Sequence, residues 1–183
     1  MTYYGAKDLA GSFRTVRKNT IVIAEELGED KYGFRATPDT RSVGEMLAHI
    51  ALVTRLPLQL HKTEKRTTLA GFDFGGFLMP LLDEEKKPRT KAEIIGMLRT
   101  EGDAFANWLE TVSDDFLGES VAMPPGMQPS SKSRFEMILG AKEHEMHHRG
   151  QLMLIERLVG LTPHLTREMN ARIAAMMAAK TTA

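Results

Sequence analysis

Several features that define common protein classes are scarce or missing in this sequence. It contains no cysteine, which excludes disulfide bonds, thiolate metal ligands and a cysteine nucleophile. Lysine plus arginine and aspartate plus glutamate number 24 each, so the formal net charge is zero and gives no support to a nucleic-acid partner. No apolar run is long enough to span a bilayer, and the first residues lack the charged and then apolar segments of a signal peptide. We therefore expect a cytoplasmic protein without a membrane or nucleic-acid partner.

The sequence does contain long stretches in which apolar residues recur at steps of three and four. This period predicts four long helices, beginning near residues 6, 42, 90 and 133 and ending near residues 27, 60, 112 and 160. Pro57 is expected to kink or end the second helix. Thr162 and Pro163 predict the start of a further, short C-terminal helix that extends to about Lys180. We predict an all-α fold without convincing strands, a four-helix bundle that forms a single domain over residues 1–183.

The connection between the second and third predicted helices is unusually long. Residues 63–89 are expected to be irregular, and residues 69–78 combine three phenylalanines with three glycines. Aromatic side chains flanked by glycine in a long connection indicate a segment that folds over an apolar surface, such as the mouth of a pocket. The alternative is a loop that only caps the end of the bundle. Residues 83–89 are expected to form an exposed loop or a short helix.

A cluster of histidines in the fourth predicted helix indicates a metal site. His144 and His148 are four residues apart, so they lie on one face of the helix, and this face is otherwise apolar. His49 lies on the inward face of the second helix, whereas His61 follows Pro57 and is expected at the surface. Imidazoles in an apolar interior would lack partners unless a metal bound them. The alternative is that His144 and His148 are ordinary core or surface histidines.

Two segments of the chain resemble the DinB family of metal-dependent bundle proteins, and the resemblance covers most of residues 6–160. One segment lies in the second helix, and the other is a string in the fourth helix that ends in His-Arg-Gly-Gln. Their order and separation in the chain match as well. The matching segments are Gly44-Glu45-Met46-Leu47-Ala48-His49-Ile50 and His144-x-x-His147-His148-Arg149-Gly150-Gln151.

This resemblance implies a fold, a metal site and an assembly. The family's helices run in an up-down-down-up arrangement with a long second connection, which suits residues 63–89. Its metal triad corresponds to His49, His144 and His148. Members often pair as homodimers. The better-known enzymes of the family transfer low-molecular-weight thiols at the metal or isomerise substrates with a thiol cofactor, while many members have no known activity.

Three neutral imidazoles would leave a divalent ion with uncompensated charge and an open coordination position. Nickel and zinc are the metals that we expect from an imidazole site. Such a centre acidifies bound water and attracts thiolates, and a thiol would have to come from a cosubstrate because the chain has no cysteine. We therefore expect a metal-dependent enzyme that acts on a small molecule, either a thiol S-transferase or a hydrolase. Glu145 and His147 flank the ligands and are the candidate acid–base residues, or else they lie on a solvent-facing helix edge.

Two alternatives to this function remain open. His144-Glu145-x-x-His148 also matches the His-Glu-x-x-His pattern of zinc proteases, in which the glutamate is the general base. The glycine and the third histidine that continue the pattern in one protease class are missing, because these positions hold Gln151 and Leu154. The other alternative is a bundle without catalytic activity, whose metal stabilises the fold or helps it to bind a small molecule.

Overall fold

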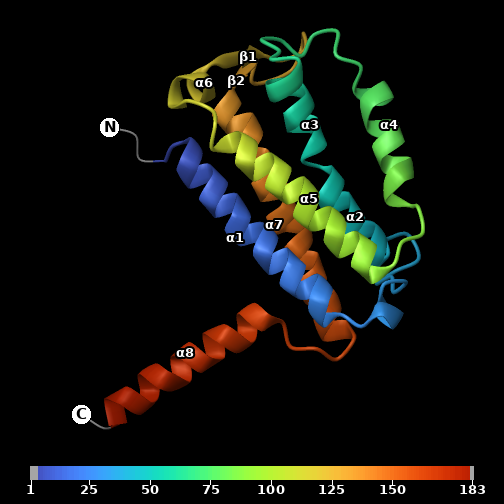
Figure 1. Cartoon of the computed structure of the whole chain (residues 1–183), viewed down its shortest axis with the longest axis vertical. Helices are drawn as coiled ribbons and strands as arrows, with labels where there is room; N and C mark the ends of the chain where they lie inside the picture. Colours follow the sequence, from blue (N-terminus) through green and yellow to red (C-terminus); the bar gives the residue numbers. More distant parts are fainter. Residues whose placement is uncertain (1–3, 182–183) are drawn as a thin grey trace.

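The computed structural model describes residues 4–181, and most of these residues form helices around a bundle (Figure 1). The four bundle helices are α1 (Ala6–Glu26), α2 (Val43–Leu52) with its continuation α3 (Arg55–Pro57), α5 (Lys91–Leu109) and α7 (Arg134–Leu158). In Figure 1, α1 and α7 run in one direction and α2 and α5 run in the other. The predicted all-α bundle and its up-down-down-up arrangement are therefore confirmed.

Three of these helices begin at serine or threonine residues that cap them. The side chains of Ser42, Thr90 and Ser133 each accept a hydrogen bond from the backbone N–H three residues later, at the starts of α2, α5 and α7. Such caps satisfy backbone donors that have no partner within the helix. They fix where the helices begin and therefore which side chains face inward.

The buried apolar side chains form two main clusters along the bundle. One cluster includes Leu47 and Leu152, and the other includes Phe13 and Phe105, whose rings meet edge to face with centroids 4.8 Å apart. A smaller third cluster lies beneath the long connection that follows α3. The core therefore runs the length of the bundle, with α2 and α7 sharing the cluster nearest the predicted metal site.

The chain remains helical beyond Pro57 because α3 leads into a wider π-helical turn, η2 (Leu58–Thr63). The prediction that His61 lies at the surface is wrong, since the residue is only 2% exposed. Its Nδ1 lies 3.1 Å from Nη1 of Arg134 at the start of α7. The π turn changes the helical phase after Pro57, so a pattern based on regular α-helical steps misplaces this side chain.

The long connection between residues 63 and 89 is less irregular than predicted. It contains a helix, α4 (Phe74–Glu85), whose first turn is capped by the side chain of Asp73. Figure 1 shows α4 beside α2, on the side of the bundle away from α1. The helix therefore brings its last residue, Glu85, next to α2.

The remaining connections add small elements that the apolar period did not predict. They are the short helices η1 (Glu29–Lys31) and α6 (Asp114–Gly118) and an antiparallel hairpin of β1 (Ser120–Ala122) and β2 (Ser131–Ser133). Val121 pairs with Lys132 in the hairpin. The all-α prediction did not include this hairpin, because strands of three residues are too short to show an alternating pattern.

The C-terminal helix, α8 (His164–Thr181), extends away from the bundle in Figure 1. Met169, Ile173 and Met176 on this helix are each more than half exposed. Within the part of the chain that the structure describes, no helix is both long and apolar enough to cross a membrane.

Candidate metal centre

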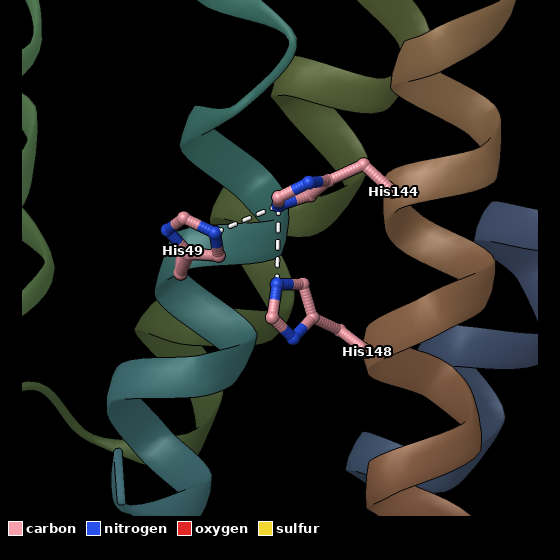
Figure 2. Close-up of side chains that lie close together, drawn as sticks. All are labelled: His49, His144 and His148. Atoms are coloured by element: carbon pink, nitrogen blue, oxygen red, sulfur yellow. Dashed lines mark hydrogen bonds between the residues drawn. The ribbon is translucent and has the colours of Figure 1, made fainter.

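Three imidazoles from two helices point at one another in the bundle (Figure 2). α2 contributes His49, and α7 contributes His144 and His148. The Nε2 atom of His144 lies 2.8 Å from Nε2 of His49 and 3.1 Å from Nε2 of His148. One nitrogen from each ring lies within 4.8 Å of the others, and this is the one group of potential ligands found among the described residues. The structure thus brings together the three histidines that the sequence singled out.

The second ring nitrogen, Nδ1, of both His49 and His148 faces an oxygen acceptor. Nδ1 of His49 lies 2.7 Å from Oε2 of Glu85, whose Oε1 accepts a hydrogen bond of 2.8 Å from Nε of Arg41. Nδ1 of His148 lies 2.7 Å from Oε1 of Gln151. Since a carboxylate or amide oxygen can only accept, each Nδ1 carries the proton. The Nε2 atoms of His49 and His148 therefore present lone pairs toward the third imidazole.

This arrangement of lone pairs fits a metal ion. A proton on Nε2 of His144 can satisfy the lone pair of His49 or that of His148, but not both. Burial lowers the pKa of all three histidines, and neighbouring positive charge contributes, so that the pKa of His144 falls to about 4. The rings are accordingly neutral at pH 7, and neutral imidazole is the form that binds divalent metals.

A cavity of about 790 Å³ opens beside the imidazoles. His148, Glu85 and Gln151 lie in its wall, so a molecule in the cavity would reach the edge of the histidine cluster. The rest of the lining mixes charged and apolar side chains, namely Arg35, Ala36, Asp39, Thr40, Arg41, Glu45, Met46, Leu82, Lys86, Leu154 and Ile155. This volume is typical of a site for a small molecule.

Glu145, one of the two predicted acid–base residues, is not brought to this cluster. It is fully buried, and its carboxylate accepts three hydrogen bonds of 2.9–3.1 Å from Nε and Nη2 of Arg17 in α1. Adjacent residues of an α-helix point about 100° apart, which turns Glu145 away from His144. Gly102 leaves room for Arg17, because a Cβ atom there would lie only 2.9 Å from the arginine Cγ. The glycine therefore accommodates the buried ion pair of Arg17 and Glu145.

His147, the other predicted acid–base residue, lies at the exposed edge of the site. Its ring centroid is 5.1 Å from that of His148. Its Nε2 lies 3.2 Å from Nε2 of Gln151, so the amide nitrogen can donate to it while the amide oxygen accepts from His148. His147 is therefore linked to the cluster through one side chain.

Sequence reasoning missed Glu85, Arg41 and the role of Gln151. Gln151 follows His148 by three residues on one helix, so its contact was accessible from spacing. Glu85 is 36 positions from His49 in the chain, at the end of α4, where the sequence predicted only an exposed loop or a short helix over residues 83–89. No local pattern connects the two residues.

Comparisons with known proteins agree with this architecture. A sequence model described as the DinB superfamily matches residues 12–152. No curated protein matches the sequence. Among solved structures, the chain is similar to YfiT from Bacillus subtilis, described as a probable metal-dependent hydrolase with an unusual four-helix bundle topology. That match has 13% identity and a TM-score of 0.68, and it covers 88% of this chain and 91% of the other.

Two further structures share the fold at low identity. The DinB-like protein YjoA from Bacillus subtilis has 19% identity and a TM-score of 0.61, with 84% of this chain and 92% of the other covered. The colibactin self-resistance protein ClbS, solved in complex with double-stranded DNA, has 14% identity and a TM-score of 0.65, with 86% and 98% covered. At such identities these matches concern the fold alone.

Proposed function

The chain belongs to the DinB superfamily, and from this premise we propose that it is a metal-dependent enzyme that acts on a small molecule. The observation that carries the proposal is the convergence of three Nε2 atoms beside a cavity, with His49 and His148 oriented by Glu85 and Gln151. His49, His144 and His148 would hold the ion, for which nickel and zinc are the expected identities.

A divalent ion held by three neutral imidazoles provides an acidic, cationic position at which water or a thiolate becomes a nucleophile. Around it, the chain's own residues have separate tasks. Glu85 and Gln151 keep the Nδ1 protons of two ligands in place, which orients both rings. Leu82 and Ile155 give the cavity apolar walls that limit the access of water to a bound substrate.

The acid–base roles of the two flanking residues are proposed to differ. His147 is exposed and linked to His148 through Gln151, so it can exchange a proton between solvent and the edge of the site. The carboxylate of Glu145 is occupied by Arg17, and we assign it a structural role. This contact disfavours the zinc-protease alternative, which requires a glutamate at the metal.

The proposed reaction is transfer of an external thiol to an electrophilic carbon, or hydrolysis. In the transfer, the thiol loses its proton, a C–S bond forms and a leaving group departs with the electrons of the bond that breaks. In a transferase, the thiol would have to come from a cosubstrate because the chain has no cysteine. A hydrolase would use water as its nucleophile and would need no thiol. The description of YfiT as a probable metal-dependent hydrolase favours the second reaction. Although ClbS was solved with DNA, the balanced charge of this chain favours a small-molecule substrate in the cytoplasm and no nucleic-acid partner.

A homodimer is the proposed assembly. Family resemblance motivates it, and so do the exposed apolar side chains of α8, among them Met169, Ile173 and Met176. A second copy of the chain would cover surface that the bundle leaves in contact with water.

Elemental analysis after metal reconstitution tests the metal site. Wild-type protein should hold about one ion per chain. His49→Ala, His144→Ala and His148→Ala should each lose it, while His147→Ala is the matched control on the same helix and should retain it. Retention by all three ligand variants would refute the site.

Activity assays test the reaction. Metal-loaded protein should consume electrophiles in the presence of small thiols, or cleave members of an ester and amide panel, and His148→Ala should do neither. A thiol that changes the absorption spectrum of cobalt-substituted protein would support transfer. Metal binding without turnover in either panel would favour the alternative of a binding protein without catalytic activity.

A further inference from the structure

A second cavity, of about 480 Å³, lies on the same side of α7 as the histidine centre but further toward the start of that helix. Met137 in its wall precedes His144 by seven residues, which corresponds to about 10 Å along the helix axis. The walls come from α3, η2, the long connection, the hairpin loop and α7, and they include Leu60, Leu69, Phe74 and Met123. The cavity therefore has its own lining, which shares no residue with the cavity beside the imidazoles.

One polar side chain, that of His61, contributes to this lining of described residues. Nη1 of Arg134 lies 3.1 Å from Nδ1 of His61. Because a guanidinium nitrogen can only donate, Nδ1 must be the acceptor and the ring proton must sit on Nε2. Burial, followed by the charge of Arg134, lowers the pKa of His61 to about 4 and keeps this ring neutral. The structure thus fixes the tautomer of His61.

The Nε2–H group is left as a free donor. Among the residues that the structure describes, none accepts a hydrogen bond from it, and Nε2 is not sealed from solvent. A donor in an otherwise apolar wall gains most from a ligand that carries one acceptor. The surrounding π turn supports a built site, since such turns cost regular hydrogen bonding and occur often where function requires them.

The charge near the cavity is already balanced. Nε of Arg134 donates to Oε2 of Glu119 over 2.8 Å, and Nη2 faces the backbone oxygen of Lys65 at 3.4 Å. The guanidinium is therefore engaged on three sides and does not offer a free positive charge to an anion. An uncharged ligand suits these walls better than a carboxylate, which would lose its hydration without gaining an ionic partner.

We propose that this cavity binds an uncharged, mainly apolar small molecule whose single acceptor, such as a ketone or ester carbonyl, takes a hydrogen bond from Nε2–H of His61. The site is independent of the metal centre. Its ligand would be held by apolar contact with the methionine and phenylalanine side chains and oriented by this one bond.

Methyl NMR of the full-length protein with labelled methionines tests the proposal, because Met123, Met127 and Met137 line this cavity while Met46 lies beside the histidine centre. Three probes of similar size are acetophenone, which has an acceptor, ethylbenzene, which has none, and benzoate, which is charged. Acetophenone should shift the three cavity signals and leave those of Met46 and Met176 unchanged. It should bind about fivefold more tightly than ethylbenzene, the gain expected from one hydrogen bond, and benzoate should bind most weakly.

Two variants separate the hydrogen bond from the cavity itself. His61→Phe should reduce the affinity for acetophenone to that for ethylbenzene. Met137→Trp, which places a larger side chain in the cavity and leaves His61 unchanged in the sequence, should abolish the shifts from both probes, while Met176→Trp on exposed α8 should not. Equal binding of ethylbenzene and acetophenone to the wild type, tightest binding of benzoate, or shifts centred on Met46 would each overturn the proposal. None of these measurements requires a metal, so their failure is distinct from failure of the proposed function.

Discussion

Replacing Glu145 by alanine separates a structural role from a catalytic one. The substitution removes three charge-assisted hydrogen bonds from Arg17, whose side chain is only 5% exposed. In the variant, Arg17 keeps its hydrogen bonds to the backbone oxygens of Leu98 and Ile50, at 2.7 and 3.1 Å, but it has no negatively charged partner. The substitution therefore destabilises the protein mainly because it leaves a buried positive charge without a partner.

Breaking one side of a buried ion pair typically costs about 3–5 kcal/mol. For a domain of this size, such a loss corresponds to a decrease in melting temperature of about 10 °C. Removing both charges in Arg17→Met/Glu145→Leu should recover most of the loss, because no charge remains without a partner and the volume stays filled. The recovery is the signature of a coupled pair.

Urea unfolding and metal analysis of the single and double variants provide the test. Both should bind metal with wild-type stoichiometry, because the carboxylate of Glu145 faces Arg17 and not the imidazoles. Turnover per folded, metal-loaded molecule should also persist. If the free energy of unfolding of Glu145→Ala lies within about 1 kcal/mol of the wild-type value and the variant yet loses turnover, Glu145 acts in the reaction and the structural assignment fails.

Three further predictions concern other parts of the chain. Glu85→Ala removes the acceptor of the Nδ1 proton of His49 and should weaken metal binding about 10–100-fold in a chelator competition, while Asp83→Ala, on the exposed side of α4, should not. Glu156 is fully buried, and burial followed by the charge of Glu26 raises its pKa from 4.5 to about 7, so the free energy of unfolding should fall as the pH rises through this range. In urea titrations, Glu156→Gln should abolish this pH dependence and stabilise the protein by about 3 kcal/mol above pH 7, and an unchanged pH dependence would refute this cause. Light scattering at micromolar concentration should give twice the 20.4 kDa chain mass, Met169→Lys should shift the mass toward one chain, and a monomeric wild type would refute the dimer.

The bundle was predictable because its helices carry their information locally. The capping side chains of Ser42, Thr90 and Ser133 mark helix starts, and apolar steps of three and four mark the inward faces. The same phase placed His49, His144 and His148 inward. Both kinds of signal depend on residues within a few positions of each other.

The remaining features depend on contacts between distant parts of the chain. Glu85 meets His49 only because α4 packs beside α2, and His61 turns inward only because a π turn and Arg134 hold it. Glu145 fits a protease motif by spacing, yet its direction is set by Arg17, 128 positions away. A motif specifies which residues are near in sequence, whereas the partner of a buried charge comes from the tertiary fold.

The guanidinium of Arg17 has a further consequence for how the protein would discriminate between metal ions. It holds Ile50 and Glu145, each the immediate neighbour of a ligand, His49 in α2 and His144 in α7. Both helices are thereby tied to one guanidinium beside the ligands, through the backbone oxygen of Ile50 and the side chain of Glu145. This restraint reduces the conformational entropy that metal binding would have to remove. A site with such fixed donor spacing favours ions whose preferred bond lengths match it over ions that bind imidazole more strongly but require a different geometry.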